Sequence, residues 1–161
     1  MSRMHSLGYL GFESPRAADW VPFGTIFGVE TGTDADGTVS VRWDDRPYRL
    51  RVIPGAEDRI AYLGWEASSP AVWRSIVDEF RADGVEVEIG SGELAAERMV
   101  RQIAIFADPF GIRHELFTGP VSLDRSFIGG RSTTSFKTGP QGLGHAVLAV
   151  PSLDLALRIE E

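Results

Sequence analysis

One short sequence motif occurs twice in this chain. It begins at Tyr9, where residues 9–14 read Tyr-Leu-Gly-Phe-Glu-Ser, and again 53 positions later at Tyr62, where residues 62–68 read Tyr-Leu-Gly-Trp-Glu-Ala-Ser. A Ser-Pro pair follows each copy, and a helical pattern follows each pair. A repeat of this length indicates a supersecondary unit that has been duplicated. We therefore expect two similar modules.

The first module is expected to have the order β-α-β-β-β. Alternating apolar and polar residues predict strands over 5–13, 29–31, 37–43 and 47–53, of which the last two form a hairpin. Ser14 is typical of a helix N-cap, and Pro15 is typical of a first helical residue. Pro22 should end or kink the helix that they begin, and Gly28 should stop it.

The second module is expected to repeat this order. Its strands are predicted over 59–67 and 85–89, followed by a hairpin within 105–119. Helices are predicted from Pro70 to Asp83, after the N-cap Ser69 and before Gly84, and from Glu93 to Met99, after Ser91. Asp-Pro-Phe-Gly at 108–111 has the residues of a type I turn and should close the hairpin.

A carboxylate lies in the middle of the last predicted strand. Glu115 stands between hydrophobic neighbours, so its side chain faces either water or a cavity that uses it; taken alone, the residue favours the face in water. His114 is adjacent, and neighbouring residues of a strand point to opposite faces. The two side chains should therefore not share one metal ion. His114 is interpreted as a surface strand residue, and His5 as an exposed residue near the N-terminus.

Composition excludes several classes of function. The formal charge is −7 and no block of Lys or Arg occurs, so nucleic acid and anionic membranes are poor partners. The absence of cysteine excludes disulfides, thiolate metal sites and a cysteine nucleophile. No apolar run resembles a signal peptide or is long enough to cross a bilayer. A cytoplasmic location is expected.

The last part of the chain differs from the two modules. Residues 119–141 are rich in Gly, Pro and Ser and are predicted to form a linker. Residues 142–150 are predicted to form a strand and 152–159 to begin a helix, as if a third module started there. Gly-Leu-Gly-His at 142–145 also matches Ser-Leu-Gly-Tyr at 6–9. A strand without neighbours should pair with another sheet, by exchange with another chain in a homo-oligomer.

Three stretches together resemble the two-domain extradiol catechol dioxygenases of the vicinal oxygen chelate superfamily. They are residues 6–12, residues 106–111 with Glu115, and residues 138–145. The resemblance implies an α+β fold of paired βαβββ modules. It also implies a non-catalytic domain over 1–118, with modules 1–56 and 57–118, a linker over 119–141, and the first strand and helix of a truncated catalytic domain over 142–161.

The same resemblance implies the metal and the reaction. Two His and one Glu would hold Fe(II), with Mn(II) as the rarer alternative, and would leave adjacent positions open for a catechol and dioxygen. His145 matches the first of these His ligands, whereas the second His and the Glu would lie beyond residue 161. The whole enzyme would cleave the aromatic ring next to the diol. The 161-residue chain alone is expected to be inactive.

Tyr9, Tyr62 and Glu115 occupy the corresponding ligand positions of the first domain, according to the resemblance. They would be the remains of a metal site that has lost both imidazoles. A phenol is a poor ligand for Fe(II) near neutral pH because its pKa is about 10. No metal is therefore expected within residues 1–118.

Two other functions are compatible with the same superfamily. One is a protein of the bleomycin-resistance type that sequesters an apolar ligand, with Trp20, Trp65 and Trp73 as pocket residues. The other is a glyoxalase-like isomerase or epimerase, which would need a metal bound through Glu115. The two tyrosines at the ligand positions argue against the second function.

Overall fold

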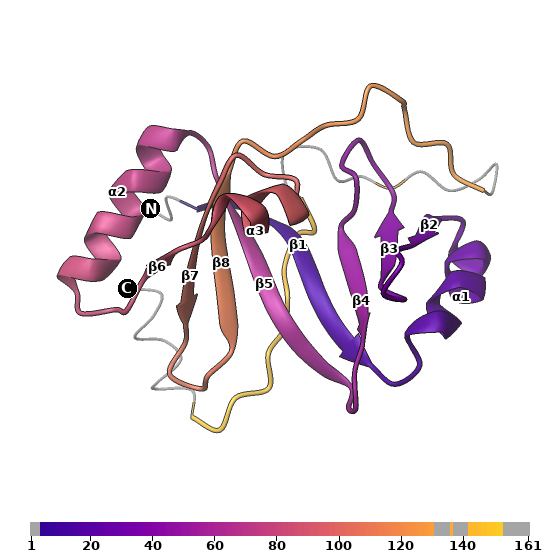
Figure 1. The fold of residues 1–161 in the computed structure, drawn as a ribbon, viewed down its shortest axis with the longest axis horizontal. Helices are drawn as coiled ribbons and strands as arrows, with labels where there is room; N and C mark the ends of the chain where they lie inside the picture. Colours follow the sequence, from indigo (N-terminus) through magenta and orange to yellow (C-terminus); the bar gives the residue numbers. More distant parts are fainter. Residues whose placement is uncertain (1–3, 131–135, 137–141, 153–161) are drawn as a thin grey trace.

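Eight strands form one mixed sheet in the computed structural model, which describes residues 4–130, 136 and 142–152 (Figure 1). The strands are β1 (Met4–Ser14), β2 (Glu30–Thr33), β3 (Val39–Arg42), β4 (Leu50–Pro54), β5 (Arg59–Ala67), β6 (Glu88–Ile89), β7 (Gln102–Ala107) and β8 (Arg113–Thr118). The helices are α1 (Trp20–Phe27), α2 (Pro70–Ala82) and α3 (Gly92–Glu97), with a 3₁₀ turn, η1, at Ala17–Asp19.

The strand order shows the duplication directly. The sheet runs β2-β3-β4-β1-β5-β8-β7-β6, so each module supplies one half of it. β1 pairs in parallel with β4, and β5 pairs in parallel with β8. The two halves meet where β1 and β5 run antiparallel. These pairings confirm the predicted α+β fold of two βαβββ modules.

The repeated Tyr-Leu-Gly motif lies at this junction. In the β1–β5 ladder Tyr9 is opposite Gly64, and Gly11 is opposite Tyr62. A Cβ atom at Gly64 would lie 2.2 Å from the Tyr9 ring, and one at Gly11 would lie 2.4 Å from the Tyr62 ring. Each ring therefore covers the glycine of the other module, which explains why the motif contains both residue types.

Helices α1 and α2 cover opposite ends of the sheet (Figure 1). Ser69 caps α2 as predicted, since its Oγ accepts from the Val72 N–H at 3.2 Å. The buried face of α2 packs on β7 and β8, and the Trp73 indole N–H donates to the Leu116 carbonyl at 2.9 Å. At the other end Trp20 packs beside the valines of β3 and β4.

The first helix begins later than predicted. Ser14 is the last residue of β1, and its hydroxyl donates to Asp58 Oδ1 at 2.6 Å instead of capping a helix. The helix α1 starts at Trp20, so Pro22 lies in its first turn, where a missing N–H is tolerated. The prediction of a helix from Pro15 that Pro22 ends or kinks is therefore wrong. Gly28 stops α1 as predicted, with φ of 77°.

Residues 142–150 do not form the predicted strand. Gly142 makes an isolated bridge to Leu7, and the Leu143 N–H donates to the Leu7 carbonyl at 2.8 Å. The described residues from 143 to 152 contain no strand. A strand needs a continuous hydrogen-bonding neighbour, and here the contact with β1 ends after this bridge. The predicted helix at 152–159 falls largely outside the described residues.

The linker predicted over 119–141 and the exchange of a strand with another chain remain predictions.

β6 is shorter than the strand predicted at 85–89, because only Glu88 and Ile89 pair with β7. Among the described residues, no helix has the length and apolar character needed to cross a membrane.

Alanine at Gly64 should destabilise the domain, because its Cβ would overlap the Tyr9 ring. Overpacking of this kind costs about 1–3 kcal/mol. Gly32, in the edge strand β2, is the matched control, since a Cβ there meets nothing within 4 Å. Urea unfolding should show a large loss for Gly64→Ala and a change within about 0.5 kcal/mol for Gly32→Ala. Equal losses of stability in the two variants would show that the contact of the Tyr9 ring with Gly64 does not exclude a larger residue at position 64.

Candidate functional site: a closed cleft between the modules

The residues that sequence analysis assigns to a lost metal site lie together under α3. Alternate residues of β8 face opposite sides of the sheet: Leu116 faces α2, whereas Phe117 belongs to the aromatic cluster on the other side. Tyr9, Tyr48 and Tyr62 belong to the same cluster, and Leu94 and Ala95 of α3 pack on it. We call the space between α3 and this face the cleft.

Aromatic rings fill the cleft. The Tyr9 ring stacks on Phe117, with 4.8 Å between ring centroids, and meets the Tyr62 ring edge-on at 6.0 Å. Burial and the nearby Glu115 carboxylate raise the pKa of Tyr9 well above its usual value. Burial also raises the pKa of Tyr62 to about 12. Both phenols therefore stay neutral at ordinary pH.

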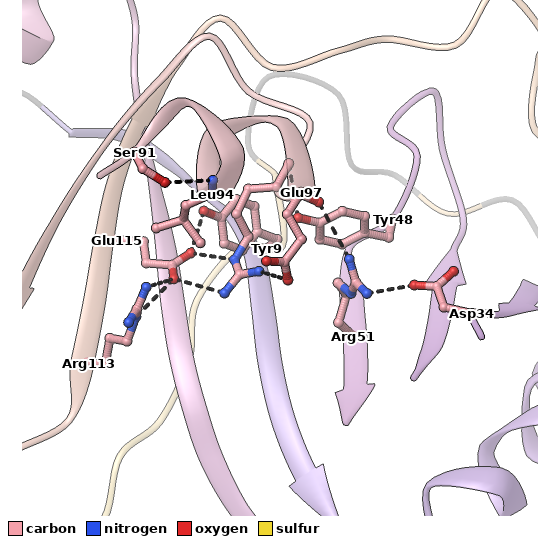
Figure 2. A network of polar contacts seen from close by, with 10 residues as sticks. Tyr9, Asp34, Tyr48, Arg51, Ser91, Leu94, Glu97, Arg113 and Glu115 are labelled. Atoms are coloured by element: carbon pink, nitrogen blue, oxygen red, sulfur yellow. Dashed lines mark hydrogen bonds and ion pairs between the residues drawn. The ribbon is translucent and has the colours of Figure 1, made fainter. Parts of the chain in front are cut away.

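Glu115 is fully buried beside these rings (Figure 2). Its Oε2 accepts from the Tyr9 hydroxyl at 2.7 Å and from Arg98 Nε at 2.9 Å. Its Oε1 accepts from Arg113 at 2.8 and 3.0 Å and from Arg98 at 3.2 Å. Of the two orientations considered for Glu115, the structure has the one that faces the cleft; the face in water, which the residue alone favoured, is wrong, because α3 and two arginines cover the carboxylate.

Arg98 follows α3 directly and reaches into the cleft. Only 8% of the residue is exposed, and its guanidinium carbon lies 4.1 Å from the centre of the Tyr62 ring, a cation–π contact. The guanidinium also pairs with Glu97. The Tyr48 hydroxyl donates to the backbone carbonyl of Arg98 at 3.0 Å. No local pattern in the sequence predicts this role of Arg98, because the reach of its side chain depends on where α3 packs.

Arg51 is the counterpart of Glu115 in the first module. Gly11 pairs with Arg51 across β1 and β4, as Gly64 pairs with Glu115 across β5 and β8. Arg51 donates to Asp34 at 2.6 Å (Figure 2). The repeat does not predict this residue, because Arg51 lies 40 positions after Gly11 whereas Glu115 lies 51 positions after Gly64. The equivalent positions of the two modules thus carry opposite charges.

A second buried network lies on the other face of β8. Trp65 Nε1 donates to His114 Nδ1 at 2.9 Å, and His114 Nε2 lies 3.5 Å from Asp108 Oδ2. The imidazole stacks on Phe106, with 5.2 Å between centroids. His114 and Glu115 face opposite sides as predicted, but the interpretation of His114 as a surface residue is wrong. Packing of Trp65 and Phe106 covers it.

The turn that precedes His114 has the predicted form. The Gly111 N–H donates to the Asp108 carbonyl at 2.9 Å, which closes the turn between β7 and β8. Asp108 Oδ1 also accepts from the backbone N–H groups of Phe110 and Ile112, at 2.9 and 2.8 Å. Asp108 therefore fixes the hairpin and faces the imidazole at the same time.

Comparison with known proteins gives matches along almost the whole chain. A family model described as dihydroxybiphenyl dioxygenase BphC D1 matches residues 7–55. The 3-methylcatechol 2,3-dioxygenase of Pseudomonas putida is 37% identical over 94% of this chain. The biphenyl-2,3-diol 1,2-dioxygenase of Paraburkholderia xenovorans is 36% identical over 96%. The chain is a relative of the extradiol dioxygenases.

The chain spans about half the length of these curated relatives, 53% and 52% respectively. The crystal structure of BphC, a halotolerant catechol dioxygenase, superposes with a TM-score of 0.91 and 39% identity, over 97% of this chain and 53% of that one. An Mn(II)-bound glyoxalase from Novosphingobium aromaticivorans shares the fold at a TM-score of 0.66 and 17% identity, over 80% of this chain and 44% of that one. A further relative, from Rhodococcus jostii, is named an iron-dependent extradiol dioxygenase and is 32% identical over 96% of this chain and 52% of its own length.

The cleft residues do not fit the Fe(II) that extradiol dioxygenases imply. Both oxygens of Glu115 are already engaged by cationic and neutral donors, and Tyr9 directs its own proton at one of them. A metal ion would have to approach two guanidinium groups of like charge. Elsewhere in the described ranges, no three His, Cys, Asp or Glu side chains are grouped as a metal site requires.

His145, the predicted iron ligand, is exposed in the segment 142–152. Its role stays a prediction, because the other ligands expected for it are not part of this sequence. His5 is exposed on β1, as expected.

A cavity of this relative of the extradiol dioxygenases lies outside the cleft. It has a volume of about 420 Å³ and lies beside α1. The lining residues are largely apolar: Trp20, Phe23, Gly24, Phe27, Val29, Val41, Trp43, Leu50, Phe136, Gly142, Leu143 and Gly144. Of the three tryptophans proposed for a ligand pocket, Trp20 lines this cavity, whereas Trp65 and Trp73 pack with the core beneath α2. The three do not form one pocket.

Acid should weaken the domain through His114. Burial lowers the pKa of His114, although Asp108 opposes the shift. As pH falls below about 7, His114 therefore takes up its proton first in the unfolded chain, where its pKa is about 6.5. The free energy of unfolding should decrease over this range until the pH reaches the lower pKa of His114 in the folded chain. Protonation would also place an N–H at Nδ1 opposite the Trp65 N–H.

Urea unfolding followed by tryptophan fluorescence from pH 7.5 to 5 should show this loss, and His114→Gln should flatten it. His5→Gln, at an exposed histidine, is the control and should keep the slope of the parent chain. An unchanged slope in His114→Gln would contradict the assignment.

Proposed function

We propose that this chain is the N-terminal part of an extradiol ring-cleavage dioxygenase that acts on a catechol-type aromatic. One observation carries the proposal: the chain matches dioxygenases at about 36% identity over nearly its whole length and superposes on one at a TM-score of 0.91. The reaction would break a ring bond next to the diol and incorporate both atoms of dioxygen. Within this enzyme, residues 1–118 would form a non-catalytic domain, 119–141 a linker, and 142–161 the beginning of the catalytic domain.

The substrate is proposed as a class. One relative is named for 3-methylcatechol and another for biphenyl-2,3-diol, so two adjacent ring hydroxyls are common to both. The closed cleft leaves no room for such a ring: the hollow there, lined by Tyr9, Arg98 and Phe117 among others, measures only about 20 Å³. Catechol binding is therefore not assigned to the cleft, and we place it in the catalytic domain that the resemblance implies.

Iron is the metal that we propose for the whole enzyme, with Mn(II) as the alternative. The name of the Rhodococcus jostii relative supports iron. His145 would be one of three ligands, with a second His and a Glu located after residue 161. A homo-oligomer and a cytoplasmic location remain predictions.

The ligand-sequestering function is the less favoured alternative. The apolar cavity beside α1 could receive a hydrophobic molecule, but the tryptophans expected around one ligand are divided between this cavity and the core. A glyoxalase-like reaction in the cleft is disfavoured, because Glu115 is already paired with Arg98 and Arg113.

The reading frame beyond Glu161 provides the test. The reading frame should encode a further His and Glu. The longer polypeptide, which consists of this chain and that extension, should be loaded with Fe(II) under anaerobic conditions. It should then consume dioxygen with 3-methylcatechol or 2,3-dihydroxybiphenyl and yield a yellow ring-cleavage product. The 161-residue chain should show no turnover under the same conditions.

His145→Ala in the longer polypeptide should abolish iron binding and lower kcat by at least about 100-fold, because a metal ligand is lost. His5→Gln should leave both unchanged. Turnover by the 161-residue chain, or full iron content in His145→Ala, would overturn the assignment of His145 and of the catalytic half.

A further inference from the structure

The ion pairs around Glu115 are not equivalent. Arg113 lies two residues earlier on the same strand, and its side chain is 39% exposed. Arg98 comes from outside the sheet, and its side chain is 8% exposed. A buried carboxylate requires a buried partner of opposite charge, because water no longer solvates it. Arg98 is therefore the group that neutralises Glu115 in the interior.

Arg98 stands between the former ligand positions. Its Nε is 2.9 Å from Glu115 Oε2, and its guanidinium carbon is 4.1 Å from the centre of the Tyr62 ring. Tyr9 donates to the same carboxylate oxygen at 2.7 Å. An ion bound by Tyr9, Tyr62 and Glu115 together would have to lie among these three side chains, and the guanidinium of Arg98 is already there.

The backbone holds Arg98 in this place. Met99 follows with φ of 55°, a left-handed conformation that turns the chain sharply at the end of α3. The N–H groups of Arg98 and Val100 donate to Leu94 and Ala95, each at 2.9 Å, and close the helix end. The Tyr48 hydroxyl holds the Arg98 carbonyl. The fold thus holds Arg98 in place through its backbone and through its side chain.

We propose that Arg98 is the internal cation of the cleft: its guanidinium occupies the place that a divalent metal ion would take beside Glu115, and thereby pairs with the buried carboxylate and keeps the cleft closed to metal ions. Removal of this side chain should turn the cleft into a site for an added cation. The proposal does not depend on ring cleavage, and it concerns residues that all belong to this chain.

Cation rescue of Arg98→Ala tests the proposal. The thermal midpoint of the 161-residue chain should fall by on the order of 10 °C in this variant, because Glu115 loses its buried partner. Methylguanidinium, or Mn²⁺ added as the chloride, should each raise the midpoint again relative to NaCl at equal ionic strength. Electron paramagnetic resonance should show Mn²⁺ bound by the variant and not by the parent chain.

Three controls isolate the carboxylate. Arg98→Ala/Glu115→Gln lacks the negative charge and should respond to neither cation. Arg98→Lys keeps a cation in the cleft and should exclude Mn²⁺. Arg59→Ala removes a partner of Glu13 at the surface and should show no specific response.

If Arg98→Ala is unfolded without additives, folding on addition of either cation supports the proposal. Failure of both cations to stabilise or refold it would overturn the proposal, as would Mn²⁺ binding by the parent chain or by Arg98→Lys.

Discussion

The antiparallel pairing of β1 with β5 is the constraint on which the rest of this structure depends. It joins the two halves of the sheet and sets Tyr9 opposite Gly64 and Gly11 opposite Tyr62. Because each ring lies where a Cβ atom would otherwise be, the register of this ladder also sets where the two hydroxyls point. The polar contacts of the cleft follow from a backbone register rather than from the polar residues themselves.

The ion pair in the cleft links the end of α3 to β8. A buried ion pair gains little over a well-packed apolar pair, whereas loss of one partner is costly. Arg98 comes from the end of α3 and Glu115 from β8, so removal of either side chain would leave the other buried charge with fewer partners. In a metal enzyme, a metal ion at this place could dissociate into the solvent. Here the positive charge beside Glu115 belongs to Arg98 and is covalently part of the chain.

Local signals in the sequence predicted much of the fold. The repeat predicted the two modules, Ser69 and Gly84 the limits of α2, and the residues at 108–111 the turn before β8. Other features depend on tertiary contacts. The alternation of side chains along a strand predicted that His114 and Glu115 face opposite sides of the sheet. It did not predict that other residues cover both sides and bury the two side chains. Ser14 and Pro15 fit the start of a helix and the end of a strand equally well, and in the structure Ser14 ends β1 and donates to Asp58.

The candidate site was predicted in part. Tyr9, Tyr62 and Glu115 were found through resemblance, and they do lie together. Arg51 and Arg98 were not found, because charged residues on a strand or helix end are usually solvated, and only the packed structure shows that these are not. The predicted strand at 142–150 failed for a related reason, since hydrogen bonding to a neighbour, and not composition, makes a strand.

The contact between Tyr9 and Glu115 spans 106 positions of sequence, and this has a consequence for synthesis on the ribosome. At about 5–20 residues per second, roughly 5–20 s pass between the appearance of the phenol and that of the carboxylate. Early in this interval β1 can pair with β4. Gly64, which the Tyr9 ring covers, is translated about halfway through the interval, and Glu115, which the phenol binds, only at its end. The nascent chain therefore presents an unfinished edge until the second half of the duplication has been translated.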